Sequence, residues 1–269
     1  TREDYTRLLW FFEGFTSYYD DLALVRTGLI DPLTYLEMIA ENIGRVTSRS
    51  GRLKQSAAES SFDAWVKYYR QDENSPNAIV SYYQKGSMIG LALDLTIRQK
   101  SGGSKSLDDV MRALWNQYGK PGIGVPENGV EAVAAAVTGI DLKSFFDQAV
   151  RGTTDLDLAA LFAGFAIGME WKVPGQSKAE DTAPASLGAN IAGEPNGDAR
   201  LAQVFDGGAA QQSGLSAGDT VVAVDGLRVN AGNLERRIKA YAAGAVVTFT
   251  AFRRDELITF NVALQLQAA

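Results

Sequence analysis

The hydrophobic pattern of this sequence changes once, near residue 172, and the change restricts the chain to two differently built domains. Up to Lys172 apolar residues recur at intervals of three and four, as on one face of a helix. Residues 173–186 are polar and contain two prolines, which predicts a linker. Beyond it lie the short β-type runs ARLAQVF, DTVVAVDG, VVTFTAFRR and LITFNVAL, with an amphipathic stretch over 233–242. We therefore predict a helical domain over 1–172 and a small α+β domain over 187–269.

Local signals divide the first domain into helices. The first helix ends at Gly28, and Asp31-Pro32 predicts the start of a second that ends near Val46. Ser106 and Asp109 have the spacing of a capping box at the start of a further helix. Other helices are predicted over 61–69, 78–99, 130–137 and 142–150. The apolar stripe of the first helix consists of Leu8, Phe12, Phe15, Tyr19 and Leu22.

Residue types that are missing exclude whole classes of site. The chain has no cysteine and no histidine, which excludes disulfides, thiolate zinc sites and Ser-His-Asp triads within it. Its net charge of −6 disfavours a nucleic-acid partner, and no apolar run is long enough to predict a membrane-spanning helix. Chemistry must therefore depend on carboxylates, hydroxyls, phenols, lysine or backbone groups, or on a site completed by residues outside the chain.

Glu13 lies among aromatic residues in the stretch LLWFFEGFTSYYDD, where a buried charge needs a partner or a metal. In a continuous helix its neighbours at three and four residues are Leu9, Trp10, Thr16 and Ser17, with Asp20 one turn on. This face is more polar than the apolar stripe of the helix, so we expect Glu13 to border a cleft. Gly14 costs about 1 kcal/mol relative to alanine inside a helix. We expect such a glycine where another backbone or a substrate comes close. A solvated or salt-bridged carboxylate is the alternative for Glu13.

The segment from Trp10 to Tyr18 resembles the one that supplies the third zinc ligand in the aminopeptidase N and glycyl aminopeptidase families. In those enzymes two histidines of an H-E-x-x-H helix and a later glutamate hold zinc, and water takes the fourth position. The resemblance implies that Glu13 is a zinc ligand. It also implies that the two histidine ligands and the general base lie upstream of Thr1. Since the chain begins without methionine, we expect a C-terminal portion that is inactive alone.

The sequence Tyr83-Gln84-Lys85-Gly86 resembles the Y-x-K-G segment of the same peptidases, whose tyrosine binds the oxyanion of the tetrahedral intermediate. A phenol donates a hydrogen bond to developing charge without carrying a competing charge. Tyr83 follows Glu13 by 70 residues, an interval similar to that of these families. The resemblance implies that Tyr83 is the oxyanion donor. Tyr82 remains an alternative, and Lys85 is expected to be solvated or ion-paired.

The second domain resembles a PDZ domain. GGAAQQSGLSAGDTVVAVDGLRV, residues 207–229, combines a short helix, glycine turns and alternating valines. SLGANI, residues 186–191, is similar to the loop and strand that receive a peptide terminus, with the helix over 233–242 as the opposite wall. A structural cap is equally compatible with the sequence, because Ala189-Asn190 predicts a shallow pocket. The residues implied for peptide binding are Leu187, Gly188, Ala189, Asn190 and Ile191.

A PDZ domain behind the zinc-ligand segment is the arrangement of the glycyl aminopeptidase family rather than of aminopeptidase N. The resemblance implies the mostly α-helical back half of a thermolysin-like catalytic domain, followed by a small α+β PDZ domain. The implied function is zinc-dependent removal of small N-terminal residues, such as glycine and alanine, from peptides. The alternative is a peptide-binding scaffold protein whose peptidase-like region is not catalytic.

Overall fold

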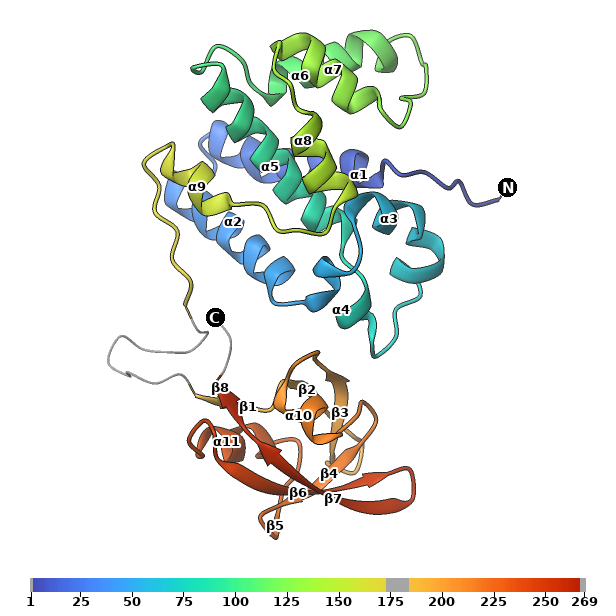
Figure 1. Cartoon of the computed structure of the whole chain (residues 1–269), viewed down its shortest axis with the longest axis vertical. Coiled ribbons are helices and arrows are strands. Elements are labelled where there is room, and N and C mark those ends of the chain that lie inside the picture. The colour runs from blue at the N-terminus through green and yellow to red at the C-terminus, as the bar shows by residue number, and fades with distance from the viewer. Residues whose placement is uncertain (1, 173–183, 267–269) are drawn as a thin grey trace. The chain divides into compact units, whose positions relative to one another are not determined.

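A computed structural model describes residues 2–172 and 184–266, so most of the predicted linker over 173–186 lies outside the described residues. The chain divides into two compact units (Figure 1). One comprises Thr1–Arg70 and Ala78–Met169, and the other comprises Gln71–Asn77 and Glu170–Ala269.

The first unit is helical, as the predicted fold class requires. Its α-helices are α1 Leu9–Arg26, α2 Pro32–Thr47, α3 Ala57–Phe62, α5 Tyr82–Lys100, α6 Leu107–Leu114, α7 Gly129–Thr138, α8 Lys143–Phe146 and α9 Leu158–Ala163. The 3₁₀ helix η1 spans Ser50–Leu53, and the short α4, Ser75–Ala78, belongs to the second unit except for its last residue. The π-helical segments of the first unit are η2 Ala64–Tyr68, η3 Trp115–Gly119 and η4 Asp147–Arg151.

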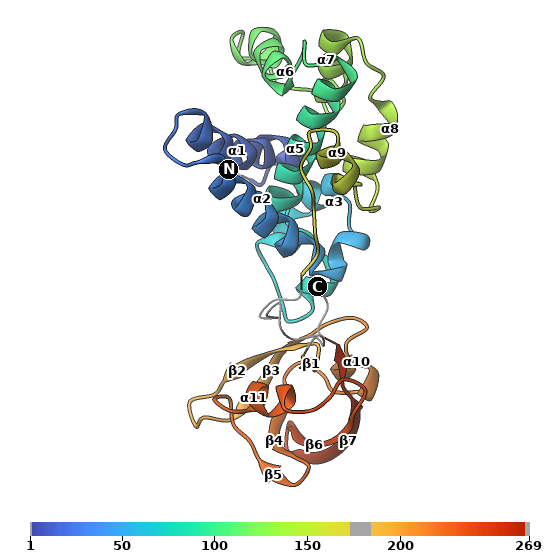
Figure 2. The same ribbon diagram turned by 90° about the vertical axis from the view of Figure 1, so that its left-hand side faces the viewer.

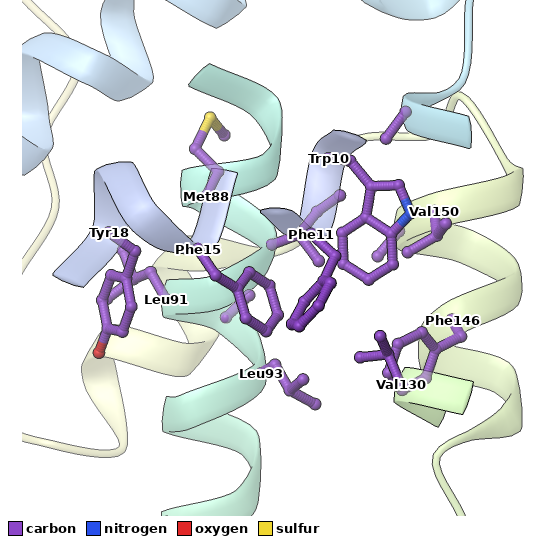
Figure 3. Close-up of a cluster of buried hydrophobic side chains, with 14 of the residues drawn as sticks. Trp10, Phe11, Phe15, Tyr18, Met88, Leu91, Leu93, Val130, Phe146 and Val150 are labelled. Atoms are coloured by element: carbon purple, nitrogen blue, oxygen red, sulfur yellow. The ribbon is translucent and has the colours of Figure 1, made fainter. Parts of the chain in front are cut away.

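The core of this unit forms where α1 packs along α5, and Trp10 and Phe15 of α1 are almost wholly buried there. Figure 3 shows these aromatic rings between α5 and the helices that carry Val130 and Phe146. The predicted stripe was wrong for Phe12, which is 45% exposed. The face of α1 that carries Gly14 is the one turned toward α5, and this rotation leaves Phe12 at the surface.

Two helix starts differ from the prediction because capping residues were overlooked. The predicted helix over 78–99 is interrupted, and α5 begins only at Tyr82, where the Ser81 hydroxyl oxygen accepts the N–H of Gln84 at 3.3 Å. The predicted helix over 61–69 begins earlier, at Ala57, because Ser56 and Glu59 form a capping box. It then continues as the π-helical η2.

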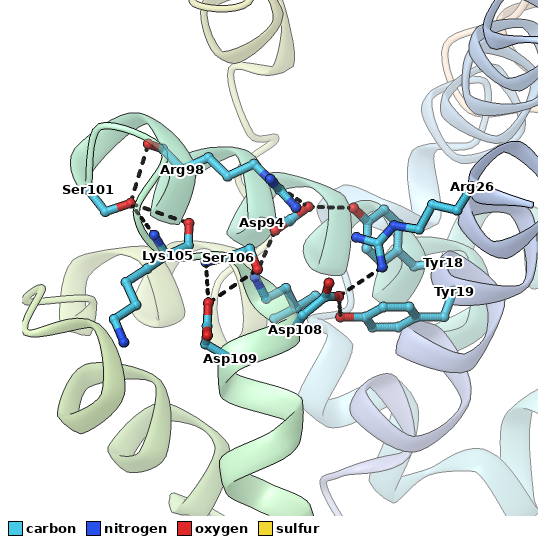
Figure 4. A network of polar contacts seen from close by, with 11 residues as sticks. Tyr18, Tyr19, Arg26, Asp94, Arg98, Ser101, Lys105, Ser106, Asp108 and Asp109 are labelled. Atoms are coloured by element: carbon cyan, nitrogen blue, oxygen red, sulfur yellow. Dashed lines mark hydrogen bonds and ion pairs between the residues drawn. The ribbon is translucent and has the colours of Figure 1, made fainter.

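Asp94 connects three helices of the first unit (Figure 4). Its carboxylate is buried and accepts the Tyr18 hydroxyl at 2.9 Å and Nε of Arg98 at 3.0 Å. It also accepts the backbone N–H of Leu107, the first residue of α6, at 2.7 Å. These donors compensate the burial of a charge and fix α1, α5 and α6 to one another.

The second unit is built on an antiparallel sheet with strand order β2-β3-β4-β6-β7 (Figure 2). The predicted β-type runs are confirmed as strands. The strands are β2 Ala189–Gly193, β3 Ala199–Val204, β4 Thr220–Val224, β6 Val246–Arg253 and β7 Glu256–Ala263, with β5 Leu227–Arg228 beside β4. The short strands β1 Ala185–Ser186 and β8 Gln265–Leu266 pair separately. The helices are α10 Ala209–Ser213 and α11 Leu234–Lys239.

Candidate functional site

Two glycines bring the backbones of α1 and α5 into contact. A Cβ atom added to Gly14 would lie 2.4 Å from the Cα of Gly86, and one added to Gly86 would lie 2.3 Å from the carbonyl oxygen of Trp10. No side chain fits in either place. The expectation that Gly14 marks the close approach of another backbone is therefore confirmed, and the partner is Gly86, which the sequence reasoning did not consider.

Glu13 precedes the first of these glycines and is half-buried on α1. Within residues 2–172 and 184–266, its carboxylate forms no ion pair or hydrogen bond, and only its backbone carbonyl is engaged, by the Ser17 hydroxyl at 3.0 Å. The alternative of a salt-bridged carboxylate therefore has no support among the described residues. Its half-buried position is compatible both with a solvated carboxylate and with a carboxylate that binds a ligand.

Tyr83 lies one helical turn before Gly86 and is half-buried. Burial raises the pKa of its phenol; the Tyr82 hydroxyl opposes this shift, while the Tyr69 hydroxyl and the negative charge of Glu13 add to it. A phenol with a raised pKa is protonated at neutral pH, as an ordinary tyrosine is, so it can donate a hydrogen bond.

Two neighbours of Tyr83 lie in the interior. Tyr82, the alternative oxyanion donor, is completely buried, with its hydroxyl oxygen 2.9 Å from that of Tyr69. Lys85 was expected to be solvated or ion-paired, and this was wrong. Its side chain is buried and Nζ donates to the carbonyl oxygen of Arg52 at 3.2 Å, and burial lowers its pKa. Of the three, Tyr83 is the one that a substrate can reach.

The donor set of this chain fits one corner of a zinc site. Glu13 offers one carboxylate on a helix, and a catalytic zinc takes three protein ligands of the carboxylate, imidazole or thiolate kind. No group of three or more histidine, cysteine, aspartate or glutamate side chains able to hold a metal occurs in the described part of the chain. Glu13 would therefore need ligands from outside these residues.

The predicted peptide-binding residues of the second unit lie along β2 and the turn before it. Leu187 is buried and its carbonyl accepts the N–H of Ala210, whereas Gly188 has a positive φ of 70° and closes the turn. Ala189, Asn190 and Ile191 belong to β2, which pairs with β3 on one edge and has no strand on its other edge among the described residues. That free edge is able to accept an added strand.

Substitution of Gly14 by alanine is expected to lower the free energy of unfolding by roughly 1–3 kcal/mol, because the new methyl group meets backbone atoms that cannot rotate away. Gly44→Ala is the matched control. Gly44 lies in α2 with nothing within 4 Å of an added Cβ, so alanine there should be neutral or stabilising by up to about 1 kcal/mol. Thermal unfolding followed by circular dichroism measures both. Equal stability of the two variants would contradict the close packing of α1 and α5.

Comparisons with known proteins match a family model to part of each of the two predicted domains. Residues 1–89 match the M61 glycyl aminopeptidase family, and residues 176–250 match the PDZ domain. A crystal structure described as an aminopeptidase N family protein, from Idiomarina loihiensis, is similar to the whole chain, with 38% identity and a TM-score of 0.90. The comparison covers 100% of this chain and 46% of that one, so the chain spans less than half of its structural relative.

Other structures resemble only part of the chain. A serine endoprotease from Yersinia pestis is 15% identical over 32% of this chain and 30% of its own, with a TM-score of 0.29. The HtrA3 PDZ domain bound to a phage-derived ligand, FGRWV, is 16% identical over 30% of this chain and 85% of its own, with a TM-score of 0.27. No curated protein matches the sequence. No helix of the described residues is long and apolar enough to cross a membrane.

Proposed function

The chain pairs an M61 glycyl aminopeptidase segment with a PDZ domain, and on this premise we propose that it forms part of a zinc-dependent aminopeptidase. The parent enzyme would remove small N-terminal residues, such as glycine or alanine, from peptides. One observation carries the proposal. The Gly14–Gly86 contact fixes α1 against α5, and these two helices carry the half-buried carboxylate of Glu13 and the half-buried phenol of Tyr83.

Each of the two side chains would have one role. Glu13 would be a zinc ligand, and zinc, when bound, supplies an electrophile that polarises the scissile carbonyl and lowers the pKa of water. Tyr83 would donate its phenolic proton in a hydrogen bond to the oxygen on which negative charge develops. Since the remaining ligands and the general base would come from a preceding segment, this chain by itself should be inactive.

The second unit would bind a peptide along β2. The free edge over residues 189–193 offers backbone N–H and C=O groups to an extended chain. The match to the PDZ domain supports this role. The backbone N–H of Gly188 already donates to the Ser186 hydroxyl oxygen at 3.2 Å. The backbone N–H of Ala189, the first residue of β2, is therefore the better candidate to bind a terminal carboxylate.

The proposal is tested by hydrolysis of aminoacyl anilides with the full-length protein. Alanine and glycine anilides should be cleaved faster than those of leucine or phenylalanine. A chelator should abolish cleavage, and added zinc should restore it. The chain of 269 residues serves as the control, since it should neither cleave these substrates nor bind zinc tightly in calorimetry. Cleavage that survives the chelator, or a nanomolar zinc site in this chain alone, would contradict the proposal.

A further inference from the structure

We propose that Tyr82 and Tyr69 are positioning residues for Tyr83. The contact between their hydroxyl groups, 2.9 Å long, fixes the first turn of α5 and with it the position of the Tyr83 phenol. The inference rests on the proposed function, because it concerns the same phenol as oxyanion donor. It assigns a role to Tyr69, which lies outside the Y-x-K-G segment, and to Tyr82, which the sequence leaves as an alternative oxyanion donor.

The start of α5 needs such support. Tyr82 and Tyr83 are the first two residues of the helix, and the backbone N–H groups of a first turn have no partner within the helix. The Ser81 hydroxyl satisfies the N–H of Gln84 only. Helix termini therefore fray unless side chains hold them. A donor that must point at one oxygen atom cannot tolerate that freedom.

Tyr82 supplies an internal anchor. Its side chain is 0% exposed and its ring stacks on that of Tyr83, with ring centroids 4.6 Å apart and planes inclined by 29°. A buried hydroxyl requires a hydrogen-bond partner, and the hydroxyl of Tyr69 lies 2.9 Å from that of Tyr82. Any movement of the Tyr83 ring therefore displaces a ring whose own hydroxyl is fixed.

The partner comes from the π-helical turn η2. Tyr69 directly follows this turn and is 55% exposed. Its hydroxyl nevertheless reaches inward, because it contacts the hydroxyl of the completely buried Tyr82. Tyr68, the last residue of the turn, packs its ring 4.9 Å from Tyr82 and 6.0 Å from Tyr83. The Ser81 hydroxyl also donates to the Tyr68 hydroxyl at 3.4 Å. Single π-helical turns are frequent at functional sites, where they redirect side chains.

Phenylalanine substitutions test the hydroxyl contact while they keep the rings. In the zinc-loaded full-length enzyme, Tyr82→Phe and Tyr69→Phe should each lower kcat roughly tenfold with little change in KM, because a donor displaced by a fraction of an ångström loses transition-state stabilisation first. The double variant should be no slower than either single variant, since both remove one contact. Tyr69→Phe alters a surface residue, so it should fold even if Tyr82→Phe does not.

A double-mutant cycle separates positioning from general support of the fold. In a Tyr83→Phe background, Tyr82→Phe should have no further effect on kcat, because it acts through the missing phenol. Binding of a phosphinic analogue of Ala-Ala, measured by calorimetry, should weaken about tenfold in Tyr82→Phe and should not weaken further in the double variant. Tyr19→Phe is the control: it removes a hydroxyl bonded to Asp108 at 2.9 Å, away from Tyr83, and should leave kcat unchanged.

The outcomes are distinguishable. If Tyr83→Phe is slow but Tyr69→Phe and Tyr82→Phe match the wild type, the positioning role is wrong and the proposed function stands. The role is also wrong if Tyr82→Phe slows the enzyme equally with and without the Tyr83 hydroxyl. If Tyr83→Phe itself retains full kcat, the assignment of the oxyanion donor is wrong, and the positioning role is lost with it.

Discussion

Glu13→Ala is expected to remove zinc and aminopeptidase activity together from the full-length protein. The carboxylate of Glu13 is half-buried, has no competing cation among the described residues, and lies on a helix whose position is fixed by backbone contact. A catalytic zinc site has three protein ligands, and loss of one leaves a cage that holds the metal poorly. Zinc content measured by elemental analysis after dialysis, beside the hydrolysis rate, tests this directly.

Asp20→Ala is the matched control for that variant. Asp20 is an exposed carboxylate two turns further along the same helix, so its removal changes the charge by the same amount at about 10 Å along the axis from Glu13. We expect it to retain both zinc and activity. A Glu13→Ala protein that still bound one zinc per chain would show that the ligand lies elsewhere.

Tyr83→Phe is expected to lower kcat by roughly 10²–10³-fold while zinc content and KM remain close to the wild type, as for removal of one oxyanion donor. Phenylalanine keeps the ring that stacks on Tyr82, so the variant loses only the hydroxyl. The effect falls on kcat because the hydrogen bond strengthens as charge develops on the substrate oxygen. Steady-state kinetics with an alanine anilide measures both constants.

The control is a second tyrosine variant measured in the same kinetic assay. A Tyr118→Phe variant loses a phenol bonded to Gln117 at 3.0 Å on η3, and it should hydrolyse the anilide at the wild-type rate. Unchanged turnover in Tyr83→Phe would exclude its phenol from the mechanism. A fall in zinc content together with kcat would instead assign Tyr83 a role in the metal site.

The sequence predicts elements well where local signals are strong. The strands of the second unit follow from alternating apolar residues between glycine turns, and α2 follows from Asp31-Pro32, whose carboxylate accepts the N–H groups of Leu33 and Thr34. The start of α5 was predicted wrongly, because apolar residues continue on both sides of Ser81 and only the cap marks the boundary. The π-helical turns have no comparable signal in the sequence.

Burial was harder to predict than helix formation. Phe12 is exposed and Lys85 is buried, against the usual preference of each side chain. In both cases the contact between α1 and α5 determines the burial, because it sets the rotation of each helix. Two glycines far apart in the sequence form that contact. The motifs indicated Glu13 and Tyr83 through resemblance. The tyrosines beside Tyr83 depend on tertiary packing that no short motif describes.

The glycine contact has a consequence for how the sequence of α1 and α5 can vary. Since main-chain atoms set the distance between these helices, the surrounding core residues can exchange one apolar side chain for another without altering the separation of residues 13 and 83. Tolerance to mutation should therefore be lowest at Gly14 and Gly86, the two positions with no side chain at all.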